Sequence, residues 1–230
     1  MAGYRLSLER AGGEHLPVVR RGPPEGPLIV LVQPLFEEQN RCRRFLADLA
    51  NELALRGIET ALPDLPATGD HEDGGPFDLV RARAALTAYI GGQSELGRLV
   101  ALRGGALLVE PQLAPRCYAL APVGGARLLR DLVRAEAVGE RERSGRSFGL
   151  SDAERLWNEG ERACLAGHEI MPQTASALRE AAPRADRVQH VGSDEDEIPG
   201  PKLWRQADPV RAREMARTVA GDVAAWIGAG

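Results

Sequence analysis

The stretch most able to organise chemistry is residues 97–109, where two short apolar runs are separated by a pair of glycines. The first run is partly β-branched and the second is rich in good helix formers, so the pattern predicts a strand, a sharp turn and a helix. In motifs of the type G-x-S-x-G, this layout lifts a nucleophilic serine above the carboxyl ends of a parallel sheet. Residues 101–105 align with that motif and place Arg103 where the serine would stand.

An arginine at this position removes the chemistry of the motif. Its side chain keeps its charge in a protein and is no nucleophile for acyl transfer. We therefore expect a turn that keeps the frame of a nucleophile elbow without its reaction. The alternative is an ordinary strand–glycine–helix junction with a solvated arginine, which is common in α/β proteins.

Polar side chains also follow two neighbouring predicted strands. Glu37, Glu38 and Asn40 come soon after the strand at 28–32, while Asp64 and Asp70 follow the strand at 58–62. Because open α/β sheets place their sites at the carboxyl ends of the strands, we expect these groups to share one crevice with the elbow. The predicted binding crevice consists of Arg103, Glu37, Glu38, Asn40, Asp64 and Asp70.

Within this crevice we expect Arg103 to be held by Glu38, with Glu37 as the alternative partner. A buried arginine needs a carboxylate partner, and Glu38 and Glu37 are the candidates if the helix that begins at Glu37 starts beside the elbow. The alternative is that both glutamates are exposed and only favour the positive end of the helix dipole.

A serine-type hydrolytic site needs a nucleophile, a histidine base and an acid that orients the base. His190 falls inside the predicted final strand and not after it, which favours a partly buried structural residue over a base. His15 and His71 lie in loops without a matched partner, and His168 packs or caps within an insertion. The sequence therefore shows no intact catalytic set.

An unconventional nucleophile is the alternative to a missing one. Ser94, Thr68 or a cysteine could take that role, although Cys42 falls on the apolar face of a predicted helix. The three cysteines are far apart, odd in number and form no C-x-x-C pair, so they suggest neither a disulfide framework nor a zinc knuckle. The acidic loop at 192–200 lacks the alternating spacing of a calcium loop. We expect no metal and no cofactor.

Periodicity and turn signals divide the chain into alternating strands and helices. The predicted strands lie at 4–9, 15–20, 28–32, 58–62, 98–102, 117–121 and 187–191, and the predicted helices at 37–56, 77–90, from the elbow to about 113, 127–138, 151–163, 171–182 and 209–227. This alternation predicts an α/β fold with a doubly wound, mostly parallel sheet and helices on both faces. We expect one domain over 1–230, with a small helical, lid-like insertion at about 123–169.

Composition narrows the classes of function. The chain has 230 residues, 43% of them hydrophobic and 27% charged, with a formal net charge of −4. That charge offers no basic field for nucleic acid. No apolar run approaches the roughly 20 residues that span a bilayer, and the first residues show no apolar leader segment. We expect a cytoplasmic protein without a membrane span.

Four short motifs resemble one family. Residues 33–43, Q-P-L-F-E-E-Q-N-R-C-R, resemble a P-F-A-E-E-x-N-K-x-R stretch, and D-L-P-A-T-G-D at 64–70 is similar to a D-L-P-G-x-G-D loop. L-R-G-G-A-L-L at 102–108 resembles an L-R-x-G-A-L-L elbow, and A-G-H-E-I at 166–170 resembles A-G-Y-E-L. These are motifs of hydrolase-2 type proteins of the bacterial exosortase A and exopolysaccharide system, which have the α/β-hydrolase fold. Ala67 and His168 depart from the family glycine and tyrosine.

The resemblance implies an α/β-hydrolase-like fold, in which the first helix starts beside the elbow and the predicted crevice residues face one site. It also implies a setting beside polysaccharide or protein-sorting machinery. With Arg103 at the elbow, the leading hypothesis is a degenerate, non-catalytic binding or accessory protein whose partner is a small anionic or acyl ligand or another protein. One alternative is an esterase or thioesterase with an unconventional nucleophile. Another is a structural module that forms a homodimer.

Overall fold

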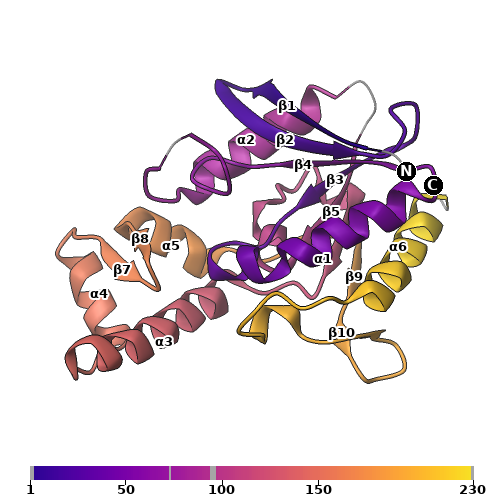
Figure 1. Ribbon diagram of the computed structural model, residues 1–230. Helices are drawn as coiled ribbons and strands as arrows, with labels where there is room; N and C mark the ends of the chain where they lie inside the picture. The colour runs from indigo at the N-terminus through magenta and orange to yellow at the C-terminus, as the bar shows by residue number, and fades with distance from the viewer. Residues whose placement is uncertain (1–2, 73, 94–96, 229–230) are drawn as a thin grey trace.

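The computed structural model describes residues 3–72, 74–93 and 97–228. Its main strands are β1 (Tyr4–Ala11), β2 (Glu14–Arg21), β3 (Leu28–Val32), β4 (Glu59–Pro63), β5 (Arg98–Leu102), β6 (Cys117–Leu120) and β9 (Arg187–Gln189). They form one seven-stranded sheet in the order β1-β2-β4-β3-β5-β6-β9 (Figure 1). The strands from β4 to β9 are parallel, and the β1–β2 hairpin joins them in antiparallel pairing.

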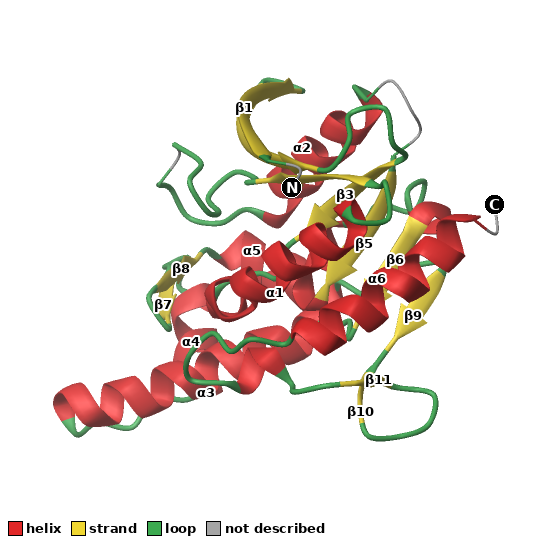
Figure 2. Cartoon of the chain, turned by 45° about the vertical axis from the view of Figure 1, so that its right-hand side comes forward, coloured by secondary structure: helices red, strands yellow, loops and turns green. Residues whose placement is uncertain are grey.

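Both faces of the sheet are buried, which explains the continuous apolar runs of the central strands. In β3, Ile29 and Leu31 enter one core and Val30 and Val32 enter the other, as the two-residue period of a strand requires. Helices α1 (Glu37–Ala54) and α6 (Arg213–Gly228) lie side by side over the first core (Figure 2). Helices α2 (Leu79–Gly91), α3 (Gly125–Ser144) and α5 (Pro172–Glu180) contribute buried residues to the second. The prediction of a doubly wound, mostly parallel sheet is confirmed.

The strand that precedes the elbow, β5, lies in the interior of this sheet, next to its central strand. β5 pairs with β3 on one side and with β6 on the other, in the registers Val30↔Leu99 and Leu102↔Leu120. The carboxyl ends of these strands therefore meet at one edge of the sheet. The chain segments that follow them build the candidate site.

The predicted helix from the elbow to about residue 113 is wrong. The chain forms a short 3₁₀ helix, η1 (Arg103–Leu108), and a second one, η2 (Ala114–Arg116). Val109 is already extended, with ψ 111°. Pro111 explains the early stop, because a proline disfavours helical backbone at the residue before it and brings no N–H of its own.

The segment between β6 and α5 differs from its prediction in two places. Helix α3 does not end at 138 but continues to Ser144, and it stops where Gly145 takes a left-handed conformation with φ 72°. Figure 2 shows α3 projecting from the end of the sheet. Helix α4 (Leu150–Asn158) is shorter than predicted, because the chain then forms the hairpin β7 (Ala163–Leu165) and β8 (His168–Ile170). The assignment of this segment as a lid-like insertion in a single domain stays a prediction.

The predicted strand at 187–191 is interrupted at His190. The residues before it pair in the large sheet, and those after it pair in a separate small sheet. β9 ends at Gln189, and β10 (Val191–Gly192) pairs with β11 (Ile198–Pro199) in a separate two-stranded sheet. The backbone N–H of Ile198 donates to the His190 carbonyl at 2.8 Å. A third 3₁₀ turn, η3 (Leu203–Arg205), then leads to α6, which begins at Arg213 and not at 209.

Candidate functional site

The elbow has the backbone geometry of a strained turn. Arg103 follows β5 directly and has φ 55°, a left-handed conformation that an arginine adopts only when its surroundings hold it there. Close packing at Gly105 is one reason why the elbow keeps this conformation. A Cβ on this glycine would lie 2.5 Å from the carbonyl oxygen of Gln33 and 2.7 Å from that of Val32, so the turn packs directly on the end of β3.

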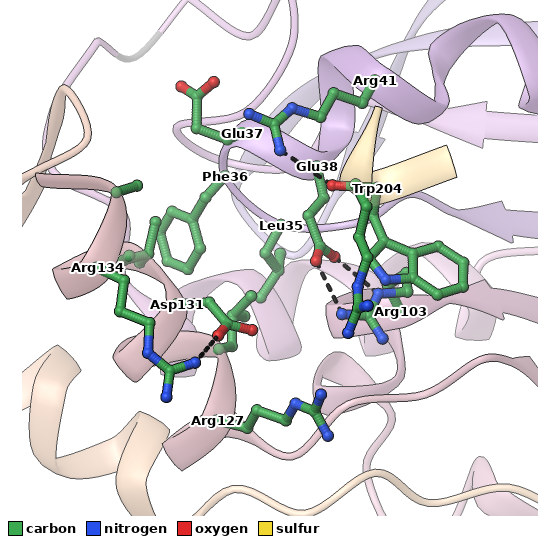
Figure 3. A pocket seen from close by; sticks show the side chains of 14 residues that line it. Leu35, Phe36, Glu37, Glu38, Arg41, Arg103, Arg127, Asp131, Arg134 and Trp204 are labelled. Atoms are coloured by element: carbon green, nitrogen blue, oxygen red, sulfur yellow. Dashed lines mark hydrogen bonds and ion pairs between the residues drawn. The ribbon is translucent and has the colours of Figure 1, made fainter. Parts of the chain in front are cut away.

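Arg103 is buried, and its guanidinium binds Glu38 through two hydrogen bonds. Nε donates to Oε2 with a donor–acceptor distance of 3.1 Å, and Nη2 donates to Oε1 at 2.9 Å (Figure 3). The remaining nitrogen, Nη1, donates to the carbonyl oxygen of Ala121 at 3.0 Å. Arg103 and Glu38 are 7% and 9% exposed. The planar fork of an arginine matches a carboxylate in this bidentate arrangement. The predicted contact between Arg103 and Glu38 is confirmed.

Trp204 lies across the face of the same guanidinium. The Arg103 Cζ lies 4.3 Å from the centroid of the Trp204 ring, a cation–π contact. Arg41 of α1 fixes η3, the 3₁₀ turn that carries the indole, because its Nη1 donates to the Trp204 carbonyl at 3.0 Å. The elbow side chain is thus held by a carboxylate, a carbonyl and an aromatic face.

Backbone strain gathers around this arginine. Five described residues other than glycine have a positive φ, and three of them follow neighbouring parallel strands: Phe36 at 59°, Arg103 at 55° and Ala121 at 47°. Such conformations cost about 1–3 kcal/mol each and cluster at functional sites. The Ala121 carbonyl accepts a hydrogen bond from Arg103, so two of these strained residues are joined directly.

A cavity of about 320 Å³ opens beside the Arg103–Glu38 pair. Its walls come from the start of α1, from the elbow, from one face of α3 and from the loop around Trp204 (Figure 3). A second cavity of about 300 Å³ shares four of these lining residues and extends to the chain after β6 and β9; the shared residues are Arg103, Arg127, Trp204 and Arg205. We call the two cavities together the elbow crevice.

The structure does not bring all of the predicted crevice residues together. Asn40 and Asp70 line a third cavity of about 400 Å³. The carboxylate of Asp64 accepts hydrogen bonds from the Gln33 side chain and from the Asp70 backbone, each at 2.9 Å, so it anchors its own loop. The expectation of one common crevice is therefore corrected, because the loop after β4 curls around Asp64.

Glu37 lines the elbow crevice but does not reach Arg103. Its Oε1 lies 3.4 Å from Nε2 of His168, and the ring of His168 contacts Phe36 edge-on at 5.2 Å between centroids. The alternative pairing of Glu37 with Arg103 is wrong. Glu37 instead connects the start of α1 with the β7–β8 hairpin.

The thiols near the sheet are poor nucleophiles. Burial raises the pKa of Cys42 and that of Cys117 to about 12, so both are protonated near neutral pH. Cys164 is exposed on β7. The Thr68 hydroxyl donates to the Leu65 carbonyl at 2.8 Å, and Ser94 lies outside the described residues.

His190 is exposed and lines the elbow crevice, which corrects the expectation of a partly buried structural histidine. It stands just after β9, the last strand of the large sheet, where the main-sheet pairing ends. The carboxylate that lines the same cavity, that of Glu197, accepts from the Asp194 backbone at 3.3 Å. No acid–histidine pair is formed between them in the described structure.

Sequence reasoning missed the groups that enclose Arg103 from the other side: Trp204, the Ala121 carbonyl, Arg41, Arg127 and Arg205. A carbonyl leaves no signal in a sequence. A tryptophan flanked by basic residues, K-L-W-R at 202–205, is the signal that could have indicated the aromatic cover. The contact of Trp204 with Arg103 could not be predicted from the sequence pattern, because about a hundred residues separate the two in the chain.

The described part of the chain holds no group of three or more histidine, cysteine, aspartate or glutamate side chains that could bind a metal ion. None of the helices in that part is both long and apolar enough to cross a membrane.

No family model and no curated protein matches this chain. Among solved structures, 2-hydroxy-6-oxo-6-phenylhexa-2,4-dienoate hydrolase from Rhodococcus sp. strain RHA1 aligns at 14% identity over 86% of this chain and 84% of its own, with a TM-score of 0.50. A thioesterase domain from the curacin biosynthetic pathway aligns at 16% identity over 98% and 99%, with a TM-score of 0.49. Epoxide hydrolase VrEH1 from Vigna radiata aligns at 21% identity over 52% and 40%, with a TM-score of 0.40, so this chain spans about two fifths of that enzyme's length.

At these identities, likeness to a solved structure shows the fold and nothing of the reaction. The Rhodococcus hydrolase extends the likeness over most of both chains. The mostly parallel sheet with helices on both faces and the strained turn after a central strand fit this fold. This chain has an α/β-hydrolase-like fold.

Proposed function

We propose that this protein is a degenerate member of the α/β-hydrolase fold that binds a small ligand in the elbow crevice without hydrolysing it. One observation carries the proposal. The elbow side chain is an arginine whose guanidinium is already engaged by Glu38, Ala121 and Trp204. A group held in this way can shape a cavity, but it supplies neither a nucleophile nor a base.

The geometry supports binding more than catalysis. Hydrolytic sites of this kind depend on a nucleophile and a base within hydrogen-bond reach of each other. At this elbow, the hydrogen bonds that would join those two groups are replaced by an ion pair between Arg103 and Glu38. What the fold retains is a cavity with a charged and apolar wall at the position where its ligand sites lie.

The biological setting is proposed from the sequence motifs alone. The resemblance to exosortase-associated proteins supports an accessory role beside bacterial exopolysaccharide or protein-sorting machinery, in the cytoplasm. The glutamate pair and the arginine elbow support it most, because the structure joins them through the contact between Glu38 and Arg103. His168, where the family has tyrosine, contacts Glu37 at the rim of the crevice.

A panel of short and long acyl esters and thioesters tests the absence of catalysis. We expect no turnover above the buffer rate at any chain length. Turnover that disappears after one substitution, such as Thr68→Val or Cys164→Ser, would instead establish a hydrolase with an unconventional nucleophile. Because a contaminating esterase would persist in every variant, loss of turnover in one such variant purified by the same protocol separates true turnover from contamination.

Restoring a serine at the elbow is not expected to restore catalysis. The Arg103→Ser variant would lack an oriented base, and general-base assistance is typically worth about 10²–10⁴ in rate. His190 lines the same crevice but is exposed. Fluorophosphonate labelling of Arg103→Ser, read by intact mass, checks this: we expect no adduct. An adduct that is lost in Arg103→Ser/His190→Ala would show that a working base is present after all.

A further inference from the structure

The charges that line the elbow crevice do not cancel. Two of its arginines are neutralised locally, because Arg103 pairs with Glu38 at 2.9 Å and Arg134 pairs with Asp131 at 3.2 Å. Arg127 and Arg205 line both cavities, and neither forms an ion pair with any described residue. Arg41 also lines the first cavity without an ion pair among the described residues, and Glu37 in the same wall offsets its charge. Two positive charges are therefore left over in a concave site.

The second cavity adds to this excess. Lys202 and His190 line it together with Arg127 and Arg205, and Glu197 is the acid in its wall. The first turn of α3, which includes Arg127, contains no acidic side chain that would offset the positive end of the helix dipole. Arg127, Arg205 and Lys202 thus define a cationic end of the crevice.

The first cavity continues from this cationic end along one face of α3. Leu128, Leu132 and Ala135 recur at the four- and three-residue spacing of a single helix face and line the cavity. Phe36 at the start of α1 lines it as well (Figure 3). The wall is therefore charged at one end and apolar beyond it.

We propose that the ligand of the elbow crevice is an amphipathic anion: a carboxylate or phosphate group held by Arg127, Arg205 and Lys202, with a short apolar chain lying along α3. This inference rests on the proposed binding function and names its ligand class. The volume of about 320 Å³ sets the size. It is at the low end of the roughly 300–1,000 Å³ of ligand pockets and would hold about ten waters at liquid density.

NMR titrations of the whole chain with hexanoate, hexyl phosphate and hexanol test the proposal. We expect one or both anions to bind, with the largest amide shifts around Gly124 and the Trp204 indole, and hexanol to bind at least about tenfold more weakly. The tighter of the two anions identifies the headgroup as carboxylate or phosphate. Acetate and inorganic phosphate should bind more weakly than their hexyl forms, because they leave the apolar wall unused.

The variant Arg127→Gln/Arg205→Gln should weaken anion binding by about tenfold or more, since it removes the two guanidiniums that line both cavities and form no ion pair with a described residue. Arg141→Gln is the matched control, because Arg141 lies on the same helix and is exposed. Equal affinity for hexanol and hexanoate, or no loss in the double variant, overturns the anionic ligand class. Neither result affects the proposed absence of catalysis, which fails only if the ester panel shows enzymatic turnover.

Discussion

Replacing Glu38 by glutamine is expected to lower the free energy of unfolding by about 3–5 kcal/mol, because the Arg103 charge stays buried without its partner. Both side chains are shielded, with side-chain exposures of 9% for Arg103 and 11% for Glu38. The cost therefore belongs to the buried class of ion pairs and not to the surface class, where the loss is about 0–1 kcal/mol.

Denaturant unfolding of Glu38→Gln, Arg103→Met and the double variant measures the coupling. We expect the double variant to lose clearly less stability than the sum of the two single losses, because it leaves no isolated charge. Glu159→Gln is the matched control: its pair with Arg155 is surface-exposed, so its loss should stay within about 0–1 kcal/mol. Additive losses in the double variant would mean that Arg103 and Glu38 do not interact in solution.

Gly105→Ala is expected to destabilise the protein by about 3 kcal/mol, at the upper end of the range for overpacking. The added methyl would approach the carbonyl oxygens of Gln33 and Val32, and these are backbone atoms of the central sheet that cannot rotate away. Relief would require the elbow to move from the end of β3. That movement would also displace Arg103 from Glu38.

Gly221→Ala supplies the matched control. Gly221 lies inside α6, and nothing stands within 4 Å of a Cβ placed there. Alanine should stabilise that helix by about 0.5–1 kcal/mol through its higher helix propensity. Thermal melts that show the same small change for both glycines would contradict the close approach of the elbow to β3.

Local patterns in the sequence were sufficient to predict the frame of the site. The buried runs at 28–32 and 98–102 are strands with the predicted bounds, because a strand covered on both faces needs uninterrupted apolar residues. The pairing of Arg103 with Glu38 followed from the order of strands that the family resemblance implied, and β3 and β5 are indeed neighbours.

The rest of the site depends on tertiary contacts that no local pattern records. Trp204 reaches Arg103 from the far end of the chain, and the Ala121 carbonyl is available only because that residue adopts φ 47°. Asp64 looked like a site residue, yet its carboxylate is used by the Asp70 N–H and by Gln33 inside its own loop. The β7–β8 hairpin escaped prediction because strands of three residues are too short to show a period.

The most direct test of the account is a crystal structure obtained after a long soak with S-butanoyl-3-mercaptopropionate, which combines a cleavable thioester with a carboxylate. We predict an intact thioester in the elbow crevice, with its carboxylate on Arg127 and Arg205 and with the bidentate contact between Arg103 and Glu38 unchanged. A butanoyl group attached to a side chain that lines the elbow crevice would contradict the central claim that this fold binds without hydrolysing. Cleaved products in the crevice would contradict it as well, when the same thioester stays intact in a protein-free soak solution.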